Sequence, residues 1–274
     1  MSAFVGLPGS ITLVGAGKMG AALLQGWAAQ GLSGEGVAIV EPQASREVTA
    51  LAAARGFRLN PPTRAPAEAL VLAIKPQMLD AVAPSLVADA GPDTLVLSIL
   101  AGKRVADLVA RLPAAKMIVR AMPNTPASIG RGISGAFACP AVDDGRRGLA
   151  SALLGAVGEV EWIESEALID AVTAVSGSGP AYVFHFVECL TKAGVEAGLP
   201  EEIAARLARA TVAGAGELLR QSGDLSPATL RENVTSPGGT TAAALAVLMA
   251  EDGLAPLLAR AVAAARRRAE ELSG

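Results

Sequence analysis

The first half of the chain alternates short, continuously apolar runs with longer helix-forming stretches. Continuous apolar runs are typical of strands that are buried on both faces of a parallel sheet. We expect such strands at residues 11–15, 37–41, 70–74, 94–99 and 116–121, with two shorter ones at 135–139 and 160–163. The pattern predicts helices between them, at residues 19–30, 45–55, 76–88, 105–112 and 143–156. Repeated strand–helix units with right-handed crossovers predict an α/β fold with a doubly wound, mostly parallel sheet.

The second half of the chain lacks this alternation. Helical runs fill it, and breaks marked by glycine or proline separate them at residues 177–180, 198–200, 223–227 and 237–239. We therefore expect two domains, an α/β domain over residues 1–165 and an all-helical domain over residues 166–274.

Composition and charge exclude several classes of protein. Hydrophobic residues make up 51% of the 274 positions and charged residues 18%, which provides a sizeable core and excludes general disorder. No stretch supplies the roughly 20 predominantly apolar residues of a spanning helix, so we expect no membrane segment. The net charge of −3 gives no electrostatic footprint for nucleic acid.

The cysteines and the first residues of the chain indicate the cellular compartment of the protein. Cys139 and Cys189 stand in apolar surroundings without a neighbouring cysteine, which predicts buried free thiols in a reducing compartment. No basic segment precedes the first apolar run, so no signal peptide is expected. We expect a cytoplasmic protein.

A glycine-rich turn joins the first expected strand to the first helix. Gly15, Gly17 and Gly20 fit the pattern G-x-G-x-x-G, with Lys18 and Met19 between them. Gly15 permits a tight turn, Gly17 lets a pyrophosphate approach the backbone, and Gly20 lets the helix pack close to the sheet. The amides at the helix N-terminus bind the diphosphate. The turn therefore predicts a Rossmann domain that binds a dinucleotide.

Glu41, at the end of the second expected strand, bears on the choice of dinucleotide. A carboxylate at this point accepts hydrogen bonds from the adenosine ribose and repels a 2′-phosphate, which favours NAD. Arg46 lies a few residues on and would engage that phosphate if Glu41 turned away. NADH and NADPH both stay open, with a slight preference for NADH.

Two further segments follow strands whose carboxyl ends line the same edge of the sheet, where α/β proteins bind ligands. Lys75 and Pro76 follow the strand at 70–74, and Ala101 follows the strand at 94–99. Asn124 stands between two prolines in residues 122–126, a rigid extended segment that suits a nicotinamide and a small substrate.

Two helix starts in the second half are candidates for substrate binding. Residues 236–241 open an alanine-rich helix with hydroxyls and free amides, which form an anion site without a formal charge; an ordinary capped helix is the alternative. Ser178 precedes another helix and either lines the site or allows close helix packing. His185 stands among aromatic and apolar residues, so we interpret it as a packed or interface histidine rather than a catalyst. No metal-ligand cluster is visible.

With these motifs in hand, the chain resembles the pyrroline-5-carboxylate reductase family. The matching segments run in family order over nearly the whole chain, and the last two are the most specific. They are Gly15-Ala16-Gly17-Lys18-Met19-Gly20, Ala73-Ile74-Lys75-Pro76-Gln77, Met122-Pro123-Asn124-Thr125-Pro126, Ser176-Gly177-Ser178-Gly179-Pro180-Ala181-Tyr182 and Val234-Thr235-Ser236-Pro237-Gly238-Gly239-Thr240-Thr241.

The resemblance implies the reduction of L-1-pyrroline-5-carboxylate to L-proline with hydride from NADPH or NADH. It also implies a helical domain that intertwines in a homodimer, and it admits a decamer built as a ring of dimers. Thr241 is implied to hydrogen-bond the imine nitrogen as the catalytic residue. The implied substrate residues are Ser236, Gly239, Thr240, Asn124 and Ser178. The implied cofactor residues are Gly15, Gly17, Lys18, Met19, Gly20, Glu41, Ala73, Lys75, Pro76, Ala101 and Asn124.

Two other functions share part of this pattern. A β-hydroxyacid dehydrogenase has the same two-domain plan but places a catalytic lysine early in the first helix of its second domain. Here the first lysine after Gly179 is Lys192, three turns along, which counts against it. A regulatory protein that senses NAD(P) without catalysis would leave residues 236–241 without a role.

Overall fold

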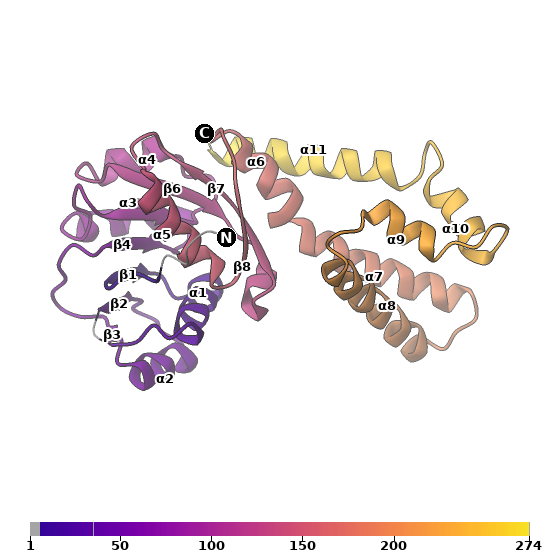
Figure 1. The fold of residues 1–274 in the computed structure, drawn as a ribbon, viewed down its shortest axis with the longest axis horizontal. Helices are drawn as coiled ribbons and strands as arrows, with labels where there is room; N and C mark the ends of the chain where they lie inside the picture. Colours follow the sequence, from indigo (N-terminus) through magenta and orange to yellow (C-terminus); the bar gives the residue numbers. More distant parts are fainter. Residues whose placement is uncertain (1–5, 35, 274) are drawn as a thin grey trace. The chain divides into compact units, whose positions relative to one another are not determined.

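One sheet organises the first part of the molecule. The computed structural model describes residues 6–34 and 36–273, and within these ranges the strands pair in the order β3-β2-β1-β4-β5-β6-β7-β8 (Figure 1). All pairs are parallel except β6 with β7. The first six strands have the order of a Rossmann fold, so the expected doubly wound, mostly parallel sheet is confirmed. The strands are β1 (Ile11–Val14), β2 (Val37–Val40), β3 (Arg58–Leu59), β4 (Ala69–Leu72), β5 (Leu95–Ser98), β6 (Met117–Met122), β7 (Gly132–Ala138) and β8 (Gly158–Trp162).

Helices cover both faces of this sheet, because its strands alternate apolar side chains between two buried layers. On one face Trp27 of α1 and Leu153 of α5 pack on the strands, and the Trp27 indole donates to the Leu153 carbonyl at 2.8 Å. On the other face Leu79 and Leu108 of α3 and α4 are fully buried. The helices of this part are α1 (Lys18–Ala29), α2 (Arg46–Arg55), α3 (Leu79–Val82), α4 (Val105–Arg111), α5 (Asp144–Gly155) and α6 (Leu168–Val172).

The helix expected at residues 76–88 is the main local difference. It consists of a 3-10 turn (Pro76–Met78), the single turn of α3 and a second 3-10 turn (Ala83–Leu86). Pro84 lies at the start of that last turn, and a proline lacks the amide that a continuing α-helix needs. The hydrophobic pattern did not predict β3, a two-residue strand at the edge of the sheet.

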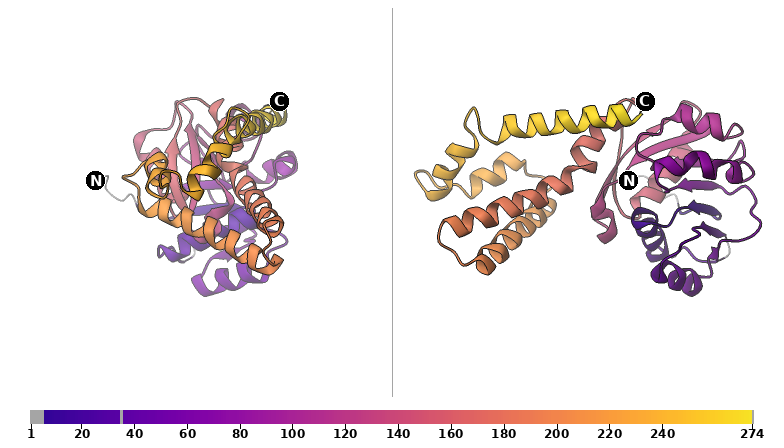
Figure 2. Two further views of the ribbon diagram at one scale, coloured as in Figure 1. Left: turned by 90° about the vertical axis from the view of Figure 1, so that its right-hand side faces the viewer. Right: turned by 180° about the vertical axis from the view of Figure 1, so that it is seen from behind.

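Helices alone form the second part, as expected. After a π-helical turn (Thr173–Gly177) come α7 (Gly179–Glu196), α8 (Glu201–Gln221), α9 (Pro227–Asn233), α10 (Thr240–Leu248) and α11 (Leu254–Ser273). Helices α7 and α8 pack side by side (Figures 1 and 2). None of the described helices is long and apolar enough to cross a membrane.

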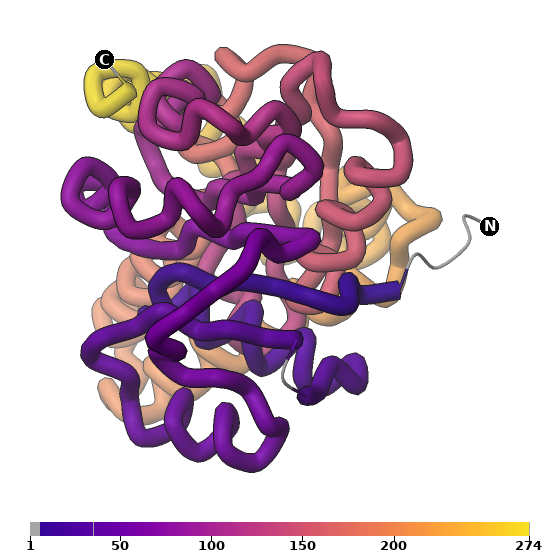
Figure 3. The backbone as a smooth tube through the Cα atoms, turned by 90° about the vertical axis from the view of Figure 1, so that its left-hand side faces the viewer, coloured from indigo at the N-terminus to yellow at the C-terminus, as the bar shows by residue number. Residues whose placement is uncertain are grey.

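By their contacts, the residues form two compact units. Unit 1 extends to Ser178 and includes the end of α11 from Ala265, and unit 2 comprises Gly179–Ala264. Figure 3 traces the backbone of unit 1 from indigo to magenta. The end of the chain is thus part of the unit that holds the sheet.

Candidate active site

The ends of three neighbouring strands, β2, β1 and β4, are aligned at one edge of the sheet in unit 1. The Gly15 amide donates to the Val40 carbonyl at 2.9 Å, and the Ala73 amide donates to the Val14 carbonyl at 2.7 Å. The chain leaves β1 between β2 and β4, where the strand order reverses. Ligands of open α/β sheets bind at such a switch point.

The three glycines of the first turn meet different surroundings. Gly15 has a φ of +91°, and a Cβ there would lie 2.7 Å from the Ala73 carbonyl. A Cβ on Gly20 would lie 2.1 Å from the Gly15 oxygen, so α1 packs directly on the turn. A Cβ on Gly17 would meet nothing within 4 Å. The turn therefore has an open approach to its backbone at Gly17 and is closed by packing at Gly15 and Gly20.

A cleft of about 480 Å³ lies beside this turn. Five residues that the sequence singled out for the cofactor are brought together in its lining: Gly15, Gly17, Glu41, Ala73 and Lys75. Three others belong to the helix that starts at the turn: Lys18 and Met19 are its first two residues, and Gly20 is buried beneath them. Pro76 opens the 3-10 turn that follows Lys75.

Glu41 is held in place by two hydrogen bonds to its carboxylate. One oxygen accepts from the Ala16 amide of the glycine turn at 2.9 Å, and the other accepts from the Gln43 amide at 3.0 Å. The carboxylate therefore lies against the glycine turn instead of pointing away. Arg46, at the start of α2, is exposed and does not line the cleft.

Asn60 is a residue that sequence reasoning missed. Its side-chain oxygen accepts from the Glu41 amide at 2.8 Å, and its side-chain nitrogen donates to the Glu41 carbonyl at 2.9 Å. Its φ of +47° is left-handed, a conformation that asparagine tolerates better than most residues. These bonds join residues that are 19 positions apart in the sequence. The residues around Asn60 therefore gave no indication of its role beyond an asparagine in a loop.

Ala101 and Asn124 follow the next strands along the sheet and do not line the cleft at the glycine turn. Ala101 is exposed, at the bend between β5 and α4. Asn124 is buried, and its side-chain oxygen accepts from the Ile133 amide at 3.0 Å. That bond ties the proline-flanked segment to β7, so the Asn124 side chain fixes the segment's position.

The loop before α10 and the start of that helix, both in unit 2, hold four of the predicted residues: Ser236, Gly239, Thr240 and Thr241. Ser236 and Thr241 are exposed, and α10 starts at Thr240 with Gly239 as its N-cap. The Gly239 amide donates to the Ser236 carbonyl at 3.0 Å, so it closes the turn. The first amides of α10, from Thr240 on, have no partner within the helix. Ser178 is not part of this loop; it ends the π-helical turn in unit 1.

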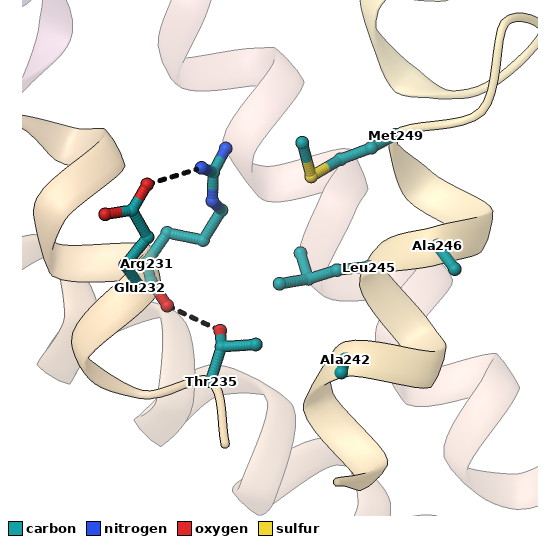
Figure 4. A pocket seen from close by; sticks show the side chains of 7 residues that line it. All are labelled: Arg231, Glu232, Thr235, Ala242, Leu245, Ala246 and Met249. Atoms are coloured by element: carbon teal, nitrogen blue, oxygen red, sulfur yellow. Dashed lines mark hydrogen bonds and ion pairs between the residues drawn. The ribbon is translucent and has the colours of Figure 1, made fainter. Parts of the chain in front are cut away.

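A pocket of about 440 Å³ lies beside this loop, between α9 and α10 (Figure 4). Thr235 forms part of its wall, and its hydroxyl donates to the Arg231 carbonyl at 2.6 Å. The opposite wall consists of Ala242, Leu245 and Ala246 of α10 and of Met249, which directly follows that helix. The pocket is therefore largely apolar, with the Arg231–Glu232 ion pair at one side.

The lone histidine and one cysteine differ from expectation within the single chain. The His185 side chain is 73% exposed, and its Nδ1 lies 2.9 Å from the Glu188 carboxylate. The prediction that His185 packs within the chain is therefore wrong, and its place in an interface stays a prediction. Cys139 is buried as expected, but Cys189 is exposed. His185 and Cys189 were expected to be buried because their neighbours in the sequence are apolar. Both belong to α7, whose side chains are not buried within the single chain.

The chain matches two family models. The first, pyrroline-5-carboxylate reductase dimerisation, covers residues 166–272, and the second, NADP oxidoreductase coenzyme F420-dependent, covers residues 10–102. The pyrroline-5-carboxylate reductase of Pseudomonas aeruginosa is 40% identical over 265 residues, which is 96% of each chain. That of Synechocystis is 46% identical over 205 residues, 75% of each chain.

Solved structures agree with these matches. A pyrroline-5-carboxylate reductase from Coxiella burnetii superposes with a TM-score of 0.89 at 35% identity, over 97% of this chain and 99% of the other. A Plasmodium falciparum pyrroline carboxylate reductase with NADP bound has a TM-score of 0.77 at 26% identity, over 97% and 98%. The resemblance found in the motifs is confirmed, and the chain belongs to the pyrroline-5-carboxylate reductase family, which are NAD(P)H-dependent oxidoreductases.

Proposed function

We propose that this chain reduces L-1-pyrroline-5-carboxylate to L-proline with NAD(P)H, the last step of proline biosynthesis. One observation carries this proposal: the match to the Pseudomonas aeruginosa reductase, at 40% identity, extends over 96% of both chains. In the reaction the imine carbon gains a hydride and the ring nitrogen keeps or gains a proton, so the C=N bond becomes a C–N single bond.

The glycine turn of unit 1 fits a dinucleotide. The open space beside Gly17 allows a diphosphate to reach the backbone, and the amides of the first turn of α1 face it. When bound, the nicotinamide supplies the hydride. Lys75 and Ala73 line the proposed cofactor cleft, Pro76 follows directly after Lys75, and Ala101 follows the neighbouring strand β5.

The hydrogen bonds of Glu41 support NADH as the better cofactor. Its carboxylate is fixed at the glycine turn by the Ala16 and Gln43 amides. A negative charge at this position accepts from ribose hydroxyls and disfavours an additional phosphate. Both cofactors are used in this proposal, with NADH preferred.

The loop at residues 236–241 binds the substrate in this proposal. The Ser236 hydroxyl and the Thr240 amide receive the carboxylate, while Gly239 shapes the turn through its bond to Ser236. Thr241 holds the imine nitrogen through its hydroxyl. A cyclic imine is basic enough to need orientation and a dry pocket more than a strong acid. Asn124 and Ser178 are secondary candidates for substrate contacts.

A homodimer is the proposed functional form. The dimerisation model covers residues 166–272, and this region exposes several large apolar side chains, among them Phe184 at 63% and Leu207 at 52%. Large apolar side chains that stay exposed in such numbers mark an interaction site. A decamer built as a ring of dimers, a domain boundary near residue 165 and a cytoplasmic location complete the proposal.

The direct test is an assay at 340 nm with purified protein, pyrroline-5-carboxylate and either NADH or NADPH. We expect absorbance to fall with both cofactors and proline to accumulate in equal amount. Omission of pyrroline-5-carboxylate is the control. Absence of oxidation with both cofactors, in protein that binds them, would overturn the proposed reaction in favour of a sensor.

A further inference from the structure

The end of the chain contacts the bend between β5 and α4. Gly102, in this bend, has a φ of +70°, and a Cβ on it would lie 2.6 Å from the Leu272 carbonyl oxygen. The two backbones therefore approach each other as closely as glycine allows. Leu272 belongs to the last turn of α11, which is part of unit 1.

A buried hydrogen bond anchors that last turn. The Ser273 hydroxyl lies 3.1 Å from a carboxylate oxygen of Asp170 on α6 and 2.9 Å from the Ala269 carbonyl. Ser273 is 8% exposed and Asp170 is 9% exposed. A carboxylate removed from water is costly unless a donor satisfies it, so a hydrogen bond donated by this hydroxyl stabilises the carboxylate and holds the last turn on unit 1.

The other side of the bend is fixed by a second buried charge. Arg120 of β6 is 3% exposed, and its guanidinium donates to Glu166 at 2.7 Å. The same Glu166 oxygen accepts from the Val105 amide, the first of α4, at 2.7 Å. The bend is thus held between Glu166 on one side and the last turn of α11 on the other.

We propose that the last turn of α11, residues 269–273, is a positioning element for the cofactor, and we term it the C-terminal clamp. It presses on Gly102 and so sets the position of the adjacent Ala101, with the Ser273–Asp170 bond as its anchor. The inference rests on the proposed function, because it takes Ala101 as a cofactor contact. Ser273 and Asp170 are positioning residues and touch no cofactor themselves.

The first test measures NADH binding by fluorescence titration of the full-length protein without substrate. Ser273→Ala removes the anchor, and we expect the Kd for NADH to rise about threefold and by no more than about tenfold, the limit set by the free energy of one lost hydrogen bond. Asp170→Asn keeps the acceptor oxygen and is expected to stay within about twofold of wild type. Glu271→Ala is the matched control, because it breaks only the exposed Arg268–Glu271 pair on the same turn.

The second test needs no cofactor. Hydrogen exchange followed by mass spectrometry is expected to show faster exchange in the peptide over residues 99–104 in Ser273→Ala, and unchanged exchange in Glu271→Ala. A double-mutant cycle with Gly102→Ala is expected to be non-additive, because both changes displace the same contact. A Ser273→Ala protein with a lower Tm but wild-type Kd and exchange would overturn the clamp and leave a purely structural bond.

The variant Ala101→Leu separates this inference from the function beneath it. If Ala101→Leu weakens NADH binding and Ser273→Ala does not, the clamp is wrong and the cofactor contact stands. If Ala101→Leu leaves NADH binding unchanged, the bend is not part of the cofactor site, and both the contact and the clamp are overturned.

Discussion

Glu41 carries the charge that distinguishes the two cofactors in this chain. Its carboxylate already accepts from the Ala16 amide, so it needs no rearrangement before a ribose arrives. We expect Glu41→Ser to raise the ratio of kcat/KM with NADPH to kcat/KM with NADH. The expected factor corresponds to roughly 1–3 kcal/mol, the scale of a like-charge contact near a surface. Steady-state kinetics with both cofactors measures this ratio.

Glu41→Gln is the control for this substitution. It keeps an oxygen that can accept from the Ala16 amide and removes only the charge. A ratio that rises in both variants assigns the effect to charge. A ratio that is unchanged in Glu41→Ser would show that the carboxylate does not face the 2′ position.

Thr241 is the residue proposed closest to the chemistry. Its hydroxyl orients the imine nitrogen more strongly as the carbon accepts hydride, so its contribution grows toward the transition state. We expect Thr241→Ala to lower kcat by about ten- to a hundredfold, which corresponds to roughly 1–3 kcal/mol for a hydrogen bond in a closed site. Thr241→Ser keeps the hydroxyl and should retain most activity.

The cofactor affinity of these Thr241 variants is the internal check. The residues proposed for the dinucleotide belong to unit 1 and Thr241 belongs to unit 2, so the Kd for NADH should not change. Wild-type turnover in Thr241→Ala would mean that water or another group holds the nitrogen.

At the scale of elements, the glycine turn combines packing with access, and two substitutions separate these roles. Gly15→Ala forces a side chain into φ +91° and against the Ala73 backbone, so we expect a lower Tm and a loss of more than about 1 kcal/mol of stability. Gly17→Ala enters open space, so we expect a nearly unchanged Tm and weaker NADH binding. Calorimetry and NADH titration of both proteins test this, and equal losses of stability would contradict it.

The buried elements were predictable because their signal is local. The strands from β1 to β6, apart from β3, are runs of apolar residues that alternate between two covered faces, and their burial needs no distant information. The two-residue β3 has no such pattern, and Pro84 divides a stretch whose composition alone indicated one helix. The glycine turn was predictable for the same reason, since its geometry depends on a few adjacent residues.

The parts of the site that escaped prediction depend on contacts between distant residues. Asn60 reaches Glu41 across a helix and a strand, and Ser273 reaches Asp170 on α6. A serine near the end of an exposed helix gives no local sign that it is buried. Exposure on α7 was misjudged for a related reason: apolar neighbours in sequence indicate burial only when some element covers that face of the helix.

At the scale of the whole molecule, the apolar surface of unit 2 predicts assembly. Phe184 on α7 is 63% exposed in the single chain, within the region that matches a dimerisation model. Burial of a phenylalanine contributes about 1.5–3 kcal/mol, and a twofold interface uses each residue twice. We therefore expect Phe184→Asp to weaken dimerisation about a hundredfold or more, measured by sedimentation over a range of protein concentrations.

Arg55→Asp provides the matched control, because it places the same side chain at the exposed end of α2 in unit 1. We expect this variant to sediment as wild type. If assembly is needed to cover unit 2, the Tm of Phe184→Asp should also fall with dilution, since association stabilises a folded protein by mass action. A Phe184→Asp protein that sediments and melts like wild type would mean that dimerisation uses another face of the helical unit.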